Sequence, residues 1–131
     1  MPGRAAASSS GRDLEDRVVA VAEALGLRAH RRVRVGRRIW GAAREIDLVV
    51  GDRQNRRLGI ECKYQGTAGS AEEKIPATID DIRAWPIAGL VVFDGEGFSA
   101  HMRSFLVSTG KAVEFEDLEP WLRLFFGLEL G

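Results

Sequence analysis

The strongest constraint on the fold lies in two apolar segments joined by a short turn. Residues 44–50 and 57–64 are rich in β-branched and aliphatic residues, and Gly51, Asp52, Gln54 and Asn55 between them are typical of a hairpin turn. The two segments therefore predict adjacent antiparallel strands. Both strands also carry charged residues within their apolar pattern, and a hairpin brings such residues close together.

The rest of the chain supplies helices and further strands. Spacing of apolar residues and turn signals predict helices over 12–25, 76–84, 98–109 and from Asp117, which we expect to cap the last helix. The same signals predict further strands over 27–39, 87–93 and 111–115. This order predicts an α/β fold, a mixed β-sheet core flanked by helices on both sides. We expect residues 1–11 to form a flexible tail and residues 12–131 to form a single domain.

Composition excludes several classes of protein. The single cysteine, Cys62, excludes an internal disulfide framework and a multi-cysteine zinc site. Apolar runs are too short to span a membrane, and residues 1–11 lack the hydrophobic stretch of a secretory signal. The sequence therefore predicts an intracellular, cytoplasmic protein without a membrane partner.

A net charge of zero conceals a strong asymmetry. Residues 1–44 carry ten arginines and four acidic residues, whereas residues 45–131 carry an excess of acids. Seven arginines and no acid occur from Arg28 to Arg44, and guanidinium groups suit phosphate oxygens. This pattern favours a nucleic-acid backbone as partner, while a solvated basic strand paired with acidic neighbours remains the alternative.

Strand alternation sorts the residues of the hairpin by face. Side chains in a strand point alternately to opposite faces. We expect one face to carry the polar residues Glu45, Asp47, Glu61, Lys63 and Gln65. We expect the opposite face to carry Ile46, Leu48, Ile60, Cys62 and Tyr64. Asp47, Glu61 and Lys63 would then form one polar cluster, with Glu45 at its rim.

Two carboxylates in such a cluster need a compensating charge. At ~5 Å and an effective dielectric constant of about 20, their repulsion is on the order of 3 kcal/mol. A proton, the Lys63 ammonium group or a divalent cation would offset it, and Mg²⁺ or Mn²⁺ prefers oxygen ligands such as these and the Cys62 backbone carbonyl. The alternative is an exposed hairpin with a cross-strand Glu–Lys ion pair of little energetic weight.

Asp47 followed by Glu61-Cys62-Lys63 resembles the signature of the PD-(D/E)XK nuclease superfamily, which has the restriction-endonuclease-like fold. The resemblance covers roughly residues 12–94. It implies that Asp47 and Glu61 bind Mg²⁺ or Mn²⁺, that Glu15 joins this site from the first helix, and that Lys63 serves the attacking water. The implied activity is metal-dependent hydrolysis of DNA phosphodiester bonds.

Within the superfamily, the small size and the segment Ser10-Gly11-Arg12-Asp13-Leu14-Glu15 resemble archaeal-type Holliday junction resolvases, which are homodimers. Two features depart from that pattern, because Ile46 replaces the usual proline and residues 66–81 do not resemble the resolvase segment. The resemblance implies a homodimer on branched DNA. A restriction-type or repair endonuclease on duplex DNA and a non-catalytic DNA-binding module of the same fold are the alternatives.

The remaining candidates concern DNA contact and dimer formation. Gln65 either touches the scissile phosphate or simply ends its strand. We expect the backbone of DNA to contact Arg31, Arg32, Arg34, Arg37, Arg38 and Arg44. Lys74 either binds a phosphate or is a solvated lysine at the start of a helix. The last helix, through Trp121, Phe125 and Phe126, is the candidate dimer interface.

Overall fold

The structure is a computed structural model, and it describes residues 9–37, 43–67 and 75–129. The helices are α1 (Gly11–Ala24), α2 (Ile75–Arg83), α3 (Ala100–Ser108) and α4 (Leu118–Phe125), the last preceded by a short 3₁₀ turn, η2 (Phe115–Asp117). The strands are β1 (Arg28–Arg37), β2 (Ala43–Gly51), β3 (Arg57–Tyr64), β4 (Ala88–Asp94) and β5 (Ala112–Glu114). The element order predicted from the sequence is confirmed.

The five strands form one mixed sheet in the order β1-β2-β3-β4-β5. Strands β1, β2 and β3 pair antiparallel, whereas β3, β4 and β5 pair parallel. The predicted α/β class with a restriction-endonuclease-like mixed β-sheet core is therefore confirmed. One detail was wrong, because Asp117 precedes α4 but its side chain makes no capping hydrogen bond.

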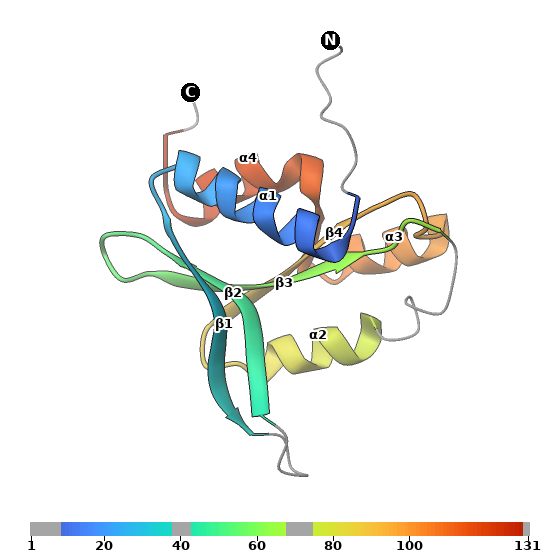
Figure 1. The fold of residues 1–131 in the computed structure, drawn as a ribbon, viewed down its shortest axis with the longest axis horizontal. Coiled ribbons are helices and arrows are strands. Elements are labelled where there is room, and N and C mark those ends of the chain that lie inside the picture. The colour runs from blue at the N-terminus through green and yellow to red at the C-terminus, as the bar shows by residue number, and fades with distance from the viewer. Residues whose placement is uncertain (1–8, 38–42, 68–74, 130–131) are drawn as a thin grey trace.

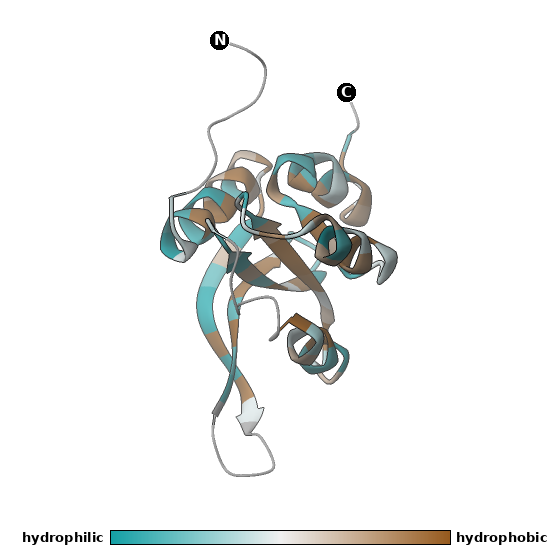
Figure 2. Cartoon of the chain, turned by 90° about the vertical axis from the view of Figure 1, so that its right-hand side faces the viewer, coloured by the Kyte–Doolittle hydropathy of each residue, from teal (hydrophilic) through white to brown (hydrophobic). Residues whose placement is uncertain are grey.

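Helices cover both faces of the sheet (Figure 1). On one face α1 and α4 pack against Leu48, Leu58, Ile60 and other buried residues. On the other face α2 and α3 pack against Val91, Phe93 and their neighbours. Figure 2 shows hydrophobic central strands and a largely hydrophilic, arginine-rich edge strand, β1.

Two glycines let α2 lie close to the sheet. An ideal Cβ on Gly59 would come within 2.7 Å of the Trp85 ring, and one on Gly89 within 2.5 Å of Ile82. Neither position has room for a side chain, so the Trp85 ring and Ile82 rest directly on β3 and β4. Trp85 thereby fills the core, and it fixes α2 beside the polar residues of β3.

The β1–β2 hairpin is irregular where Arg32 and Asp47 lie opposite each other. Arg32 has a positive φ of 53°, which interrupts the alternation of β1. On β2, Ile46 packs with the α2 side of the core, whereas Leu48 packs with the α1 side. The expectation that Ile46 and Leu48 share a face is therefore wrong, because the regular alternation of β2 is interrupted at Asp47, opposite Arg32. Beyond this point the far half of the hairpin runs away from β3 (Figure 1).

The exposed apolar residues are few. Val107 and Leu124 are 60% and 73% exposed, and Phe125 is 37% exposed. Phe126 is fully buried in the core of its own chain, so its predicted place in a dimer interface is wrong. Among the described residues, no helix is long and apolar enough to cross a membrane.

Candidate active site at the fork between two strands

The candidate site lies where β2 separates from β3. Backbone pairing of these strands ends at Leu48 and Ile60. Beyond that point the two strands are joined by hydrogen bonds from main-chain N–H groups to carboxylate side chains. The Cys62 N–H donates to Asp47 Oδ2 at 3.0 Å, and the Asp47 N–H donates to Glu61 Oε1 at 3.1 Å. Each acid thus binds the main chain of the other strand, so both carboxylates are held in the fork.

Crowding in the fork shifts the protonation of Glu61. Burial and the nearby Asp47 carboxylate raise the pKa of Glu61 to about 7, although Lys63 and the Asp47 N–H act in the opposite direction. Lys63 therefore compensates the two acids only in part. Near neutral pH Glu61 is therefore partly protonated.

This raised pKa predicts that the metal-free protein loses stability as pH rises from about 4.5 to about 7. Below this window Glu61 is protonated in both folded and unfolded chains, and above it the folded chain carries the full cost of the second charge. After allowance for solvent screening this cost is on the order of 2 kcal/mol. Glu61→Gln should keep the acceptor and abolish this component of the pH dependence, as measured by urea unfolding at pH 5 and pH 8 in EDTA. An equal pH dependence in both proteins would contradict the assignment.

Cys62 contributes its main chain to the fork. Its N–H points toward Asp47, and in an extended strand the carbonyl of the same residue points to the same edge. The carbonyl therefore faces the gap where β2 has left the ladder. Burial, reinforced by nearby Asp47, Glu15 and Glu61, raises the pKa of the thiol. The thiol thus stays protonated and is no nucleophile.

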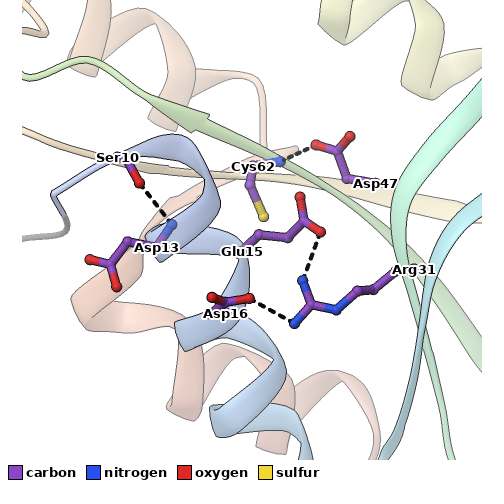
Figure 3. Close-up of polar contacts among 7 residues, drawn as sticks. All are labelled: Ser10, Asp13, Glu15, Asp16, Arg31, Asp47 and Cys62. Atoms are coloured by element: carbon purple, nitrogen blue, oxygen red, sulfur yellow. Dashed lines mark hydrogen bonds and ion pairs between the residues drawn. The ribbon is translucent and has the colours of Figure 1, made fainter.

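Glu15 reaches the neighbourhood of the fork from α1 (Figure 3). Its carboxylate accepts from Arg31 Nη1 at 2.9 Å, and Asp16 accepts from Arg31 Nη2 at the same distance. Glu15 is therefore paired with an arginine in this state. In the described part of the chain, no three His, Cys, Asp or Glu side chains are grouped so as to hold a metal ion. Asp47 and Glu61 meet, whereas Glu15 is adjacent but separately engaged.

Cavities open on both faces of the sheet near the fork. On the α2 side a cavity of about 310 Å³ is lined by Arg44, Glu45, Glu61, Lys63, Ala77, Thr78, Asp81 and Trp85. On the α1 side a cavity of about 240 Å³ is lined by Arg12, Glu15, Arg31 and Arg32. The larger cavity brings Glu45, Glu61 and Lys63 together, whereas Asp47 is not among its lining residues.

The other predicted site residues lie in different settings. Gln65 is 5% exposed and donates to the Gly97 carbonyl at 2.7 Å, so it holds the loop after β4 rather than facing either cavity. Arg44 lies 3.8 Å from Asp81, within the larger cavity. Arg32 and Arg34 are exposed on β1. The Arg37 side chain, Arg38 and Lys74 lie outside the described residues, as does the tail over 1–8.

Sequence reasoning missed the contribution of α2. Thr78, Asp81 and Trp85 line the larger cavity, and Asp81 restrains Arg44 beside Lys63. Their spacing of three and four residues places them on one helical face together with the buried Ile82. The available signal was Asp81, a charged residue on the apolar face of a short helix. Such a residue predicts a polar partner on the sheet against which the helix packs.

The residues of the fork fit a hard divalent cation. Two carboxylates and a backbone carbonyl supply oxygen donors, and the raised pKa of Glu61 marks a need for positive charge. Water and substrate oxygens normally complete the shell of Mg²⁺, so two carboxylates from the protein suffice. Asp47, Glu61 and the Cys62 carbonyl are therefore the candidate ligands.

Comparison with known proteins places these residues in a family context. A family model described as a PD-(D/E)XK nuclease superfamily domain matches residues 6–123. The crystal structure of a protein of unknown function, AF1548, is similar in fold, with a TM-score of 0.53 and 20% sequence identity over 77% of this chain and 56% of that chain. This chain thus spans little more than half of that protein, and the likeness bears on the fold alone. No curated protein matches the sequence.

Proposed function

Because the chain belongs to the PD-(D/E)XK nuclease superfamily, we propose that it is a metal-dependent endonuclease that hydrolyses phosphodiester bonds in DNA. The observation that carries this proposal is the pair of crossed carboxylates in the fork, with Lys63 beside Glu61. A simple binding surface gains nothing from two acids that repel each other, whereas a cation site requires them.

Each residue of the fork has a defined task in this proposal. Asp47 and Glu61 hold Mg²⁺ or Mn²⁺ together with the Cys62 carbonyl. A bound cation of this kind lowers the pKa of a water ligand and stabilises charge on a phosphate. Lys63 orients the attacking water or neutralises charge that builds on the phosphate. Glu15 already accepts a hydrogen bond from Arg31 through Oε1, which leaves Oε2 as the oxygen that it could contribute.

The arginines of β1 support DNA as the substrate. Arg32 and Arg34 are exposed on this edge strand, next to the fork. Arg31 instead pairs with Glu15 and Asp16. For this residue the alternative holds, in which the arginines of the strand pair with acidic neighbours. We therefore assign phosphate binding to Arg32 and Arg34, which are exposed, and to Arg44. The same role for Arg37, Arg38 and Lys74 is proposed from the sequence alone.

Replacement of Arg32, Arg34, Arg37 and Arg38 by Gln should weaken DNA binding and flatten its salt dependence. Each lost phosphate contact lowers the slope of log K against log salt by about 0.9. Fluorescence anisotropy in EDTA at several salt concentrations measures this slope without cleavage. The control is replacement of Arg83 and Arg123, which line neither cavity beside the fork. An unchanged slope in the β1 variant would contradict the assigned surface.

For the substrate structure, we favour a four-way junction cut by a homodimer. One chain of this size offers one fork, and two symmetrical cuts require two. The segment from Ser10 to Glu15 supports this subtype, whereas Ile46 and residues 66–81 depart from it. A restriction-type or repair endonuclease on duplex DNA is the second candidate, and a non-catalytic DNA-binding module is the third.

Cleavage of end-labelled junction, duplex and single-stranded DNA, side by side with Mg²⁺ and with EDTA, separates these candidates. Paired symmetrical nicks near the branch are expected, and only with Mg²⁺. Cleavage of plain duplex at an equal rate would move the assignment to the restriction or repair type. Tight, salt-sensitive binding without cleavage of any substrate would favour the binding module.

A further inference from the structure

We propose that a third pocket, between Arg28 and Arg57, binds a backbone phosphate of the DNA several nucleotides from the bond that is cut. This proposal rests on the proposed DNA-directed function. The pocket lies where β1 begins, β2 ends and β3 begins, away from Asp47. It has a volume of about 240 Å³ and is lined by Arg28, His30, Val33, Val49, Gly51, Asp52, Asn55 and Arg57.

A glycine creates the slot between the two arginines. Gly51 pairs with Arg28 on one side and with Arg57 on the other, so the three residues form one row across the sheet. Adjacent strands lie about 4.8 Å apart, which places the two arginine backbones about 10 Å from each other. Because Gly51 has no side chain, the space between the guanidinium groups stays open.

Positive charge in this pocket lacks a partner. Asp52 is the one acid of its lining, but its carboxylate accepts from the backbone N–H groups of Gln54 and Arg56 and from Arg56 Nε at 2.7 Å. Its side chain is only 10% exposed. Among the described residues, neither Arg28 nor Arg57 takes part in an ion pair. An anion is therefore the expected occupant.

The floor of the pocket favours a sugar–phosphate over an isolated ion. Val33 and Val49 supply an apolar surface below the cationic rim, and the deoxyribose ring of a nucleotide suits such a surface. Asn55, whose φ is 62°, sits in the adjoining turn and adds a polar side chain to the rim. These features match one unit of a DNA strand.

The position of the pocket matches the path of a bound strand. Arg57, Gly59 and Glu61 alternate along β3, so the pocket and the larger cavity open on the same face of the sheet. The Trp85 ring covers Gly59 between them, so a strand that reaches both must pass over Trp85. Four residues separate Arg57 from Glu61, which corresponds to about 13 Å along the strand. With one phosphate per 3.4 Å of helix axis on each DNA strand, this distance corresponds to about four phosphates.

The test uses three variants: one that removes the arginines of the pocket, a control that removes two other arginines, and one that fills the pocket with a side chain. Arg28→Gln with Arg57→Gln removes both cations of the pocket, and Arg53→Gln with Arg83→Gln removes two exposed cations that do not line it. Gly51→Leu fills the slot and keeps both arginines. Gly51 has an ordinary φ, and its Cβ would lie 3.3 Å from the Arg56 carbonyl, so the Arg56 backbone must shift by a few tenths of an ångström.

Anisotropy with a 20-bp duplex in EDTA should show about tenfold weaker binding for the Arg28/Arg57 variant and for Gly51→Leu. The salt slope of the arginine variant should fall by about one. In cleavage assays KM should rise about tenfold while kcat is unchanged, because the fork is intact. The control should stay within twofold of the parent. Parent-like binding by the Arg28/Arg57 variant, or an equal loss in the control, would overturn the pocket.

The same data separate this proposal from the proposed function. If the parent protein binds and cuts DNA but the Arg28/Arg57 variant is unaffected, only the pocket is refuted. If the parent binds no DNA at all, both proposals are refuted. Should Gly51→Leu fail to fold by circular dichroism, the arginine variants still decide the question.

Discussion

Asp47→Asn should lower the rate of DNA cleavage by at least about a thousandfold while DNA affinity stays within a few fold of the parent. A thousandfold loss corresponds to about 4 kcal/mol of transition-state stabilisation, which is in the range expected for a disrupted metal site. Asparagine has the same shape, and its Oδ1 can still accept the Cys62 N–H. The loss should therefore come from the missing charge and not from a collapsed fork.

A second effect of Asp47→Asn distinguishes this account from general damage. Asp47 contributes to the raised pKa of Glu61, so its neutralisation should raise the melting temperature of the metal-free protein at pH 8. Asp80→Asn, which changes an acid that is 79% exposed on α2, is the matched control and should alter neither cleavage nor melting. An Asp47→Asn protein that melts lower than the parent and cuts DNA normally would contradict the assignment.

Lys63→Met should also abolish most of the cleavage, by roughly a hundredfold to ten-thousandfold. Its effect on stability should have the opposite sign. Lys63 lowers the pKa of Glu61, so its removal leaves the two acids less compensated and should destabilise the metal-free protein at pH 8 but not at pH 4. Thermal melts at both pH values, together with cleavage rates in Mg²⁺, measure both effects.

Lys63→Arg separates the two possible tasks of the lysine. Arginine stays charged at all relevant pH values, so it can neutralise phosphate charge but cannot accept a proton from water. Cleavage near the parent rate would assign Lys63 to charge stabilisation, and a loss as large as that of Lys63→Met would assign it to the water. Full activity of Lys63→Met would remove Lys63 from the site.

The sequence predicted the elements of this fold well because local signals and core packing agree. The Gly51–Asn55 turn, the apolar strands and the Ser10 cap of α1 each specify structure over a few residues. Predictions that depended on strict strand alternation did less well. Ile46 and Leu48 lie on opposite faces because alternation is interrupted at Asp47, opposite Arg32, whose positive φ no residue-type pattern would indicate.

The candidate site was predictable in part because local sequence signals place its strands side by side. Asp47, Glu61 and Lys63 follow from two adjacent strands, and the structure brings the two acids together through crossed hydrogen bonds. The pairing of Arg31 with Glu15 was not predictable, since it joins residues of different elements through long side chains. The burial of Phe126 and the role of Asp81 likewise depend on how helices dock on the sheet.

The proposed nuclease depends on Asp47 and Glu61 holding one divalent cation together. Titration of metal-free protein with Mn²⁺, followed by electron paramagnetic resonance at pH 7.5, measures this directly. The parent should bind Mn²⁺, and Mg²⁺ should compete for the same site. Asp47→Asn and Glu61→Gln should each weaken binding at least tenfold, a difference of about 1.4 kcal/mol or more. Unchanged Mn²⁺ binding in both variants would contradict a metal site in the fork.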